Sequence, residues 1–226
     1  MRWLGLNYGC YKNARNASWR CLIDYKIDKL PVKVSSIVHK SEIILLKNSN
    51  VNLLKDEESG TTLMQKGKLY IVYSDKQSVR RCRFTIAHEL GHIFLGHMFQ
   101  ADGNGFVTTD AAEHSANVFA RDLLAPACVL HELQILTAAE ISMLCNISLE
   151  AATYRANRMQ ELEKRNAFYK HPLEREVVKQ FIEFINKKKS QSQVELWLTK
   201  KDMRRKRTPR YYFTLCDIYC QWNAFY

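Results

Sequence analysis

The chain has 226 residues, of which 46% are hydrophobic and 25% charged; this composition can bury a core and excludes an intrinsically disordered chain. No apolar run approaches the roughly 18 residues of a membrane-spanning helix, so we expect no membrane partner. The formal net charge is +11, and most of the surplus lies in the last third, which marks a compositional boundary near residues 155–170.

The cysteines and the first residues predict a cytoplasmic location. The seven cysteines are odd in number and scattered along the chain, which favours reduced thiols over a disulfide framework. Residues 1–8 lack the apolar core of a signal peptide. We therefore expect the protein to stay in the cytoplasm.

Helical and alternating apolar spacings predict the elements of the first third. Two helices are expected at residues 11–26 and 31–38, and three strands at 42–47, 61–65 and 68–73. The last two strands form a hairpin around a Lys66-Gly67 turn. Two interpretations of the third strand stay open: a core strand, or an edge strand that pairs with a substrate backbone, as in zinc peptidases of the thermolysin type.

Residues 88–92 read H-E-L-G-H, which is the motif H-E-x-x-H. On a helix the two histidines, His88 and His92, lie on one face about 5–6 Å apart at Cβ, so both can bind one metal ion. Glu89 lies beside that face, where it can take a proton from water as a general base. Ser78 is placed to cap the start of the helix. The alternative is a pair of ordinary histidines on an amphipathic helix.

A catalytic zinc ion keeps three protein ligands and one open position, so the motif needs a third ligand from another element. Glu113 is the leading candidate, because it lies one turn into an expected helix at residues 110–126 that can pack against the first. The rivals are its neighbour His114 and also His97. His97 lies five residues beyond His92, which places it about 140° away around a helix.

Two further patterns bear on the ligand set. Asp110 and Glu113 also have the spacing of a capping box, and this role is compatible with metal binding. The metzincin motif needs glycine three residues after the second histidine and another histidine three residues further on. Leu95 and Met98 occupy those places, so the metzincin pattern is excluded.

Two segments carry a resemblance to a known family. Residues 83–92 read R-F-T-x-A-H-E-L-G-H, and residues 113–126 read E-x-x-A-N-x-F-A-x-x-L-L-x-P; together they closely resemble the ImmA/IrrE family of metallopeptidases. The resemblance covers roughly residues 10–165 and implies a gluzincin-type core with Glu113 as the third zinc ligand. It also places Asn117 where related peptidases keep a carboxylate that orients a ligand histidine.

The segment after the second metal helix has a helix–turn–helix outline. A short helix is expected after a capping Thr137, and another begins after a capping Ser148. DNA reading is one interpretation, but its exposed face offers few basic residues, and in the resembling family a similar element closes over the catalytic helices. Tyr154 and Arg155 are candidates for stabilising the oxyanion, on position alone.

Residues 169–226 form a basic, aromatic-rich extension that departs from the family pattern. We expect a helix at 174–187, a linker, a strand at 194–198 and a basic stretch at 200–210. Basic residues beside aromatic ones can bind nucleic acid through phosphates and base stacking. The alternative is a solvated basic loop before a core strand.

The sequence thus predicts an α+β protein with a zincin-like core of mainly helices packed on a small β-sheet. We expect a metallopeptidase domain at residues 1–168, with a helical capping segment at about 127–165, and the basic extension at 169–226. The resemblance implies a zinc endopeptidase, with one Zn²⁺ per chain, that cleaves a helix-turn-helix transcriptional repressor of a mobile element or stress response. Two rivals stay open: a non-cleaving protein that binds the repressor, and a DNA-associated regulator that acts through the basic extension.

Overall fold

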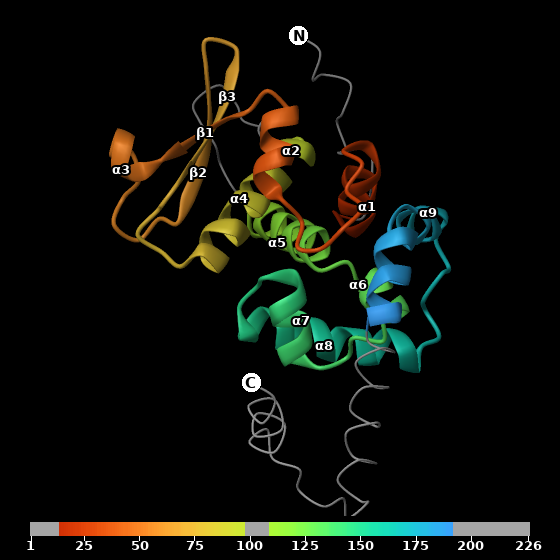
Figure 1. The fold of residues 1–226 in the computed structure, drawn as a ribbon. Helices are drawn as coiled ribbons and strands as arrows, with labels where there is room; N and C mark the ends of the chain where they lie inside the picture. The colour runs from red at the N-terminus through yellow and green to blue at the C-terminus, as the bar shows by residue number, and fades with distance from the viewer. Residues whose placement is uncertain (1–13, 98–108, 192–226) are drawn as a thin grey trace, which may run out of the picture. The chain divides into compact units, whose positions relative to one another are not determined.

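The computed structural model describes residues 14–97 and 109–191 (Figure 1). The chain divides into two compact units, Met1–Asn186 and Lys187–Tyr226, and the elements below lie in the first. In chain order they are α1 (Ala14–Asp24), α2 (Val34–Lys40), β1 (Ile44–Lys47), α3 (Asn48–Val51), β2 (Gly60–Gln65), β3 (Lys68–Tyr73), α4 (Val79–Phe94), α5 (Asp110–Leu124), α6 (Ala127–Glu132), α7 (Ala138–Cys145), α8 (Leu149–Lys164) and α9 (Pro172–Gln180). The predicted α+β class is confirmed: helices dominate, and one small mixed sheet accompanies them.

The sheet has the strand order β1-β3-β2. β1 pairs with β3 in parallel, and β2 pairs with β3 in antiparallel register, with Thr62 opposite Ile71. β3 is therefore the central strand, and its Ile71 and Val72 are buried. Of the two interpretations of this strand, the structure supports the core strand and places β2 at an edge of the sheet.

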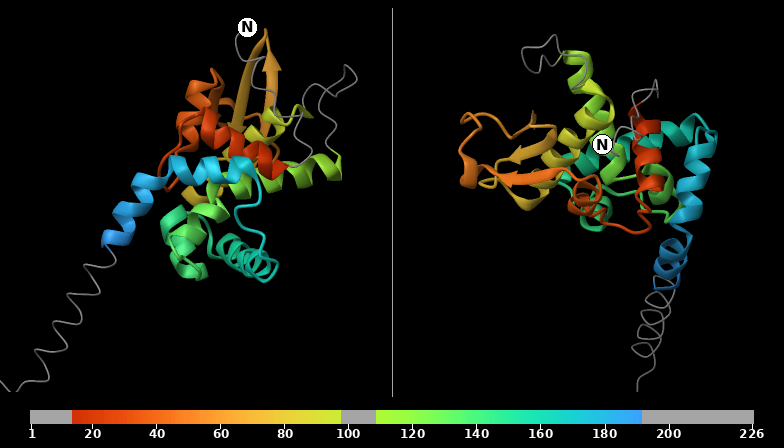
Figure 2. Two further views of the ribbon diagram at one scale, coloured as in Figure 1. Left: turned by 90° about the vertical axis from the view of Figure 1, so that its right-hand side faces the viewer. Right: turned by 90° about the horizontal axis from the view of Figure 1, so that it is seen from above.

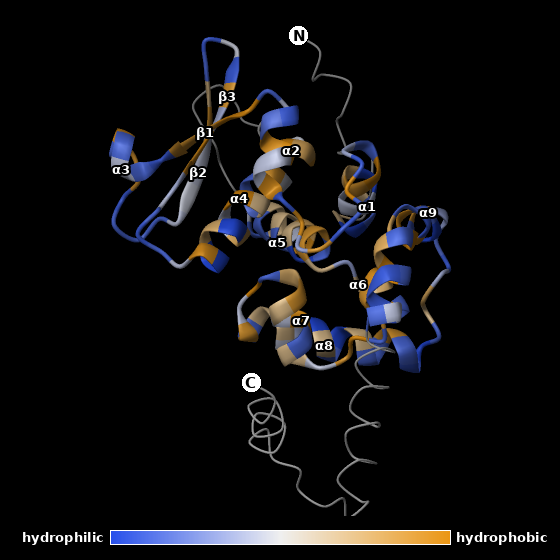
Figure 3. Cartoon of the chain, viewed as in Figure 1, coloured by the Kyte–Doolittle hydropathy of each residue, from blue (hydrophilic) through white to orange (hydrophobic). Residues whose placement is uncertain are grey.

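The helices pack around α5, which contacts both α4 and α1. Figures 1 and 2 show the sheet on one side of the α4–α5 pair and α7 and α8 on another. In Figure 3 hydrophilic residues gather at α3 and at the turn between β2 and β3. The apolar residues of α4 and α5 belong instead to the buried core, which includes Leu90, Phe119 and Leu123. This packing buries the sides of α4 that contact the neighbouring elements and holds the H-E-x-x-H helix in one orientation.

The helix caps follow the sequence closely, with one exception. The side chains of Ser78, Thr137 and Ser148 cap α4, α7 and α8 as predicted. The prediction that Asp110 and Glu113 form a capping box is wrong. Thr109 is the N-terminal cap of α5, and its hydroxyl accepts a hydrogen bond from the Ala112 amide. Glu113 therefore falls one residue past the capping-box position, and its carboxylate remains available for other partners.

The turn between α7 and α8 is bound to α4. Arg83 donates from Nε to the Asn146 carbonyl and from Nη2 to the Cys145 carbonyl, each over 3.3 Å. Arg80 donates to the Ser142 hydroxyl over 3.2 Å. The two Arg83 bonds satisfy carbonyl groups that the end of α7 leaves without helical partners. The helix–turn–helix outline thus packs against the metal helix through its turn.

The last described part of the chain differs from the prediction in detail. Instead of one helix at 174–187, α9 spans Pro172–Gln180, a turn follows at Phe181, and residues 182–191 are again helical. His171 caps α9 by accepting from the Leu173 amide. The expected strand at 194–198 and the basic stretch at 200–210 lie outside the described residues, so nucleic-acid binding there stays a prediction. The proposed division at residue 168 also stays a prediction. Among the described residues no helix is long and apolar enough to cross a membrane.

Candidate metal centre and active site

The H-E-x-x-H motif lies in the last two turns of α4. Helical geometry places His88 and His92 on one face, and their ring centroids are 4.7 Å apart. His92 is buried, with 3% of its surface exposed, whereas His88 is partly open to solvent. The local sequence thus presents two imidazoles side by side, as the motif predicts.

A glycine between the two histidines lets α5 approach α4 closely. A Cβ added to Gly91 would lie 3.1 Å from Ala116 Cα and 3.2 Å from the Ala116 carbonyl oxygen. A Cβ at these distances would force the backbone at Ala116 to move by a few tenths of an ångström, so the glycine permits the close approach of the two helices. The contact positions the first turns of α5 beside the two histidines, and so brings Glu113 to them.

The three predicted ligands come together in the structure. Glu113 Oε2 lies 3.1 Å from His88 Nε2, Glu113 Oε1 lies 3.3 Å from His92 Nε2, and the two imidazole nitrogens are 3.0 Å apart. Ligands bound to zinc at 2.0–2.2 Å in a tetrahedron would be about 3.3 Å from one another. The spacing and the donor types therefore fit one small metal ion, and these residues form the one such cluster found among the described residues.

Hydrogen bonds at the outer nitrogens orient both imidazoles. His88 Nδ1 lies 3.1 Å from Asn117 Oδ1, and His92 Nδ1 lies 3.1 Å from His97 Nδ1. When the outer nitrogen of a histidine donates its proton, Nε2 keeps a lone pair for a metal. Burial lowers the pKa of both ligand histidines, and the pKa of His92 falls to about 4, with the charge on His88 as the next cause. Both rings are therefore neutral near pH 7, as metal binding requires.

His97 does not lie where it would if α4 continued past Phe94. α4 ends at Phe94, and Gly96 adopts a positive φ of 76°. The chain therefore turns back, and the His97 ring comes within 5.1 Å of the His92 ring. The predicted separation of about 140° between His92 and His97 around the helix assumes that α4 continues to His97, so this prediction is wrong. His97 contacts the outer nitrogen of His92 and is not in the three-residue metal cluster.

Glu89 points away from solvent toward β2. Its side chain is buried, and its Oε2 accepts a hydrogen bond of 2.6 Å from the Thr62 hydroxyl. Burial raises the pKa of Glu89 to about 7, the Thr62 hydrogen bond opposes this rise, and the Glu113 charge adds to it. A carboxyl group with a pKa near 7 can both accept and return a proton at neutral pH. No sequence motif marks Thr62, because its contact with Glu89 depends on how β2 lies against α4.

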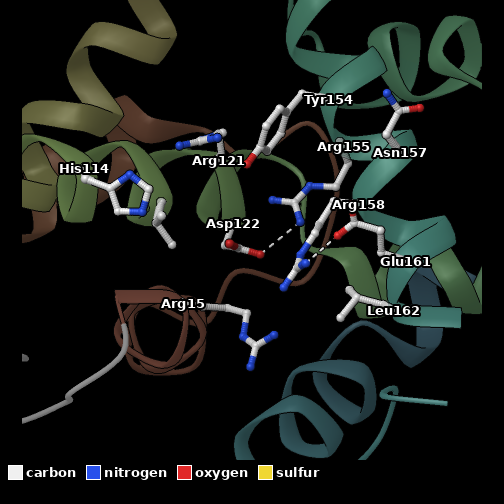
Figure 4. A pocket seen from close by; sticks show the side chains of 11 residues that line it. Arg15, His114, Arg121, Asp122, Tyr154, Arg155, Asn157, Arg158, Glu161 and Leu162 are labelled. Atoms are coloured by element: carbon white, nitrogen blue, oxygen red, sulfur yellow. Dashed lines mark hydrogen bonds and ion pairs between the residues drawn. The ribbon is translucent and has the colours of Figure 1, made fainter. Parts of the chain in front are cut away.

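The two oxyanion candidates lie elsewhere. Tyr154 and Arg155 line a pocket between α1, α5 and α8 (Figure 4). The pocket includes none of the three clustered residues, and it also holds the rival ligand candidate His114, which is not part of the metal cluster. Arg155 is buried and forms an ion pair of 3.1 Å with Asp122. Tyr154 is 55% exposed, and the centroid of its ring lies 4.5 Å from the Arg121 guanidinium carbon. The structure thus brings together Asn117 and the metal cluster, but not these two residues.

The fold and the His-His-Glu cluster define a metallopeptidase of the zincin-like class. A family model described as the IrrE N-terminal-like domain matches residues 46–157, which include both metal helices. The chain belongs to the ImmA/IrrE family of metallopeptidases, which are peptide-bond hydrolases. The resemblance seen in the sequence is thereby confirmed. No curated protein matches the chain.

Replacing Thr62 by Val is expected to move the acid limb of the pH–rate profile to higher pH. Since the Thr62 hydrogen bond lowers the pKa of Glu89, its loss raises that pKa, and less of the carboxylate is ionised in mild acid. A bound cation lowers the pKa in both proteins, so the difference persists. A net hydrogen-bond energy of about 1 kcal/mol corresponds to a roughly fivefold lower kcat/KM on that limb. Thr61→Val changes the neighbouring residue in β2 and should leave the profile in place; equal profiles for all three proteins would contradict the expectation.

Replacing Gly91 by Val is expected to push α4 and α5 apart. The added side chain would meet backbone atoms of Ala116, which cannot rotate away. Overpacking of this kind costs about 1–3 kcal/mol of the free energy of unfolding, and it should also weaken metal binding, because the ligands sit on both helices. Urea unfolding and metal titration would measure the two effects. Ala111→Val, at an exposed site of α5, controls for the helix propensity of valine; a Gly91 variant as stable as this control would refute the expectation.

Proposed function

We propose that the chain is a zinc-dependent endopeptidase in which His88, His92 and Glu113 hold one Zn²⁺. The observation that carries the proposal is the convergence of two neutral imidazoles and a carboxylate from two helices, with donor atoms 3.0–3.3 Å apart. Nitrogen and oxygen donors in this number and spacing suit zinc, with one position left for water or substrate. Asn117, through the hydrogen bond to His88, orients one ligand.

Zinc, when bound, supplies Lewis acidity toward water and the peptide carbonyl. Glu89 is the general base in this proposal: it takes a proton from the attacking water and returns it to the leaving amine. Burial and the Thr62 hydrogen bond hold its carboxyl group in one orientation beside the ligand helix. Burial raises the pKa of Glu89 above its ordinary value, which favours the uptake of a proton from water.

The substrate proposed is a helix-turn-helix transcriptional repressor, whose cleavage would derepress a mobile element or a stress response. Membership of the family supports a protein substrate, and the resemblance supplies the class of protein. A bound segment would pair as an extra strand with β2, because β2 is an edge of the described sheet and touches Glu89 through Thr62. We place this reaction in the cytoplasm, where such repressors act.

The test is to incubate the zinc-loaded chain with a purified repressor encoded beside its gene. We expect two repressor fragments with one new N-terminus. A chelator should stop the cleavage, and added Zn²⁺ but not Mg²⁺ should restore it. If the repressor loses its operator binding while it stays intact, the peptidase proposal for this partner fails and the non-cleaving interpretation replaces it.

A further inference from the structure

Gly60 is the first residue of β2 and lies against α4, close to Glu89, the proposed general base. Residues two apart in a strand point to the same side, so Gly60 lies on the side of β2 from which the Thr62 hydroxyl donates to Glu89 Oε2. On α4, Thr85 lies about one helical turn before Glu89. The strand and the helix therefore meet at two successive contacts, Gly60 with Thr85 and Thr62 with Glu89.

The first of these contacts leaves no room for a side chain on β2. A Cβ added to Gly60 would lie 2.3 Å from Thr85 Cγ2, and also 3.2 Å from the Val72 carbonyl oxygen and 3.4 Å from Glu89 Oε1. Carbon atoms that are not bonded lie best about 3.5–4.0 Å apart, so the contact with Thr85 would be too short by roughly 1 Å. Thr85 is buried, and a β-branched side chain in a helix has little freedom to rotate. A side chain at residue 60 therefore requires β2 or Thr85 to move.

A displacement of β2 would reach Glu89 through Thr62. The hydrogen bond between the Thr62 hydroxyl and Glu89 Oε2 is 2.6 Å long, and an increase of about 1 Å would take it beyond the distance at which a hydrogen bond is made. We propose that Gly60 is a positioning residue for the peptidase reaction. Because it has no side chain, β2 lies close enough to α4 for Thr62 to hold the carboxyl group of Glu89 in place.

This inference rests on the proposed function, in which Glu89 is the base. It concerns the base and not the metal ion, because Gly60 and Thr85 are outside the cluster of His88, His92 and Glu113. A loss of activity with unchanged zinc content is therefore the effect that it predicts.

The test exchanges one methyl group between the strand and the helix in the zinc-loaded full chain. In Gly60→Ala we expect kcat/KM for repressor cleavage to fall by about 10–100-fold, because a misplacement of about 1 Å can cost about 10²-fold in rate. Serine is threonine without Cγ2, so Thr85→Ser removes the atom that the new Cβ would meet. Thr85→Ser alone should cleave at nearly the wild-type rate. The double variant Gly60→Ala/Thr85→Ser should recover most of the lost rate.

A second comparison shows whether Gly60 acts through the base. Substitutions that act through the same group are not additive, so Gly60→Ala should have little further effect on the residual cleavage by Glu89→Gln. A general distortion of the fold would instead lower the rate by the same factor in both backgrounds. Elemental analysis should find one zinc ion per chain in each variant, and circular dichroism establishes folding. If Gly60→Ala alone is not folded, the double variant decides.

Several outcomes would overturn the inference. Cleavage by Gly60→Ala at the wild-type rate would show that Thr85 gives way without moving the base. A loss that Thr85→Ser does not repair, or an equal loss in the Glu89→Gln background, would mean that the contact with Thr85 does not position Glu89. Loss of zinc from Gly60→Ala would assign the glycine to the metal centre instead. Absence of cleavage by the wild type is a different result, because it would refute the proposed function itself.

Discussion

Glu89→Gln is expected to reduce repressor cleavage by about 10³-fold while zinc stays bound. The amide is nearly the same size as the carboxylate and can still contact Thr62, but it cannot take a proton from water. General-base catalysis typically contributes 10²–10⁴-fold, and the carboxylate of the buried Glu89 is held beside the ligand helix by its hydrogen bond with Thr62. The measurement is kcat/KM for fragment formation, together with the zinc content of the same sample.

The control for this substitution is Glu57→Gln, which makes the same chemical change in the exposed segment before β2. It should cleave at the wild-type rate. Cleavage by Glu89→Gln at a rate within tenfold of wild type would exclude Glu89 as the base. Loss of zinc from Glu89→Gln would instead show that the residue helps to hold the metal centre together.

Glu113→Gln is expected to remove zinc and, with it, much of the protein's thermal stability. The carboxylate joins α5 to the two histidines of α4, so a metal ion held by all three links helices that are separated by the segment 95–109. A ligand that binds only the folded state adds about 4 kcal/mol when its concentration is 1,000 times its Kd. Wild type should therefore melt at a higher temperature with zinc than with a chelator, and the variant should melt at one temperature in both.

The variant is compared with Glu150→Gln, which lies exposed in the first turn of α8. This control should retain one zinc ion per chain and the zinc-dependent rise in Tm. If Glu113→Gln also retains zinc with unchanged affinity, the third ligand lies elsewhere. The deficit in zinc would be measured by elemental analysis after dialysis, which does not depend on activity.

The parts of the site that the sequence predicted are those with local causes. His88 and His92 follow from helical periodicity, and the caps Ser78, Thr137 and Ser148 follow from side chains that bond to their own helix. Glu113 could be predicted as a ligand because it lies in the first turns of a helix that packs against the H-E-x-x-H helix. For such features the spacing along the chain decides the geometry.

The features that the sequence missed depend on contacts across the fold. Thr62 reaches Glu89 only because β2 pairs with β3 and lies on α4, and His97 reaches His92 only because the chain turns at Gly96. For the same reason the sequence did not predict which strand of the hairpin lies at the edge of the sheet. The answer depends on the parallel pairing of β1 with β3, which are distant in sequence. Neither periodicity nor composition carries information about such pairings.

The position of β2 has a consequence for which bonds in a substrate can be cut. An added strand must be extended over several residues, and the DNA-reading helices of a repressor are not. The cleaved bond would therefore lie in a linker, or in a helix that opens transiently at a cost in free energy set by local stability. In the second case mutations that stabilise that helix would slow cleavage without touching the peptidase, and the repressor's own folding would set its lifetime.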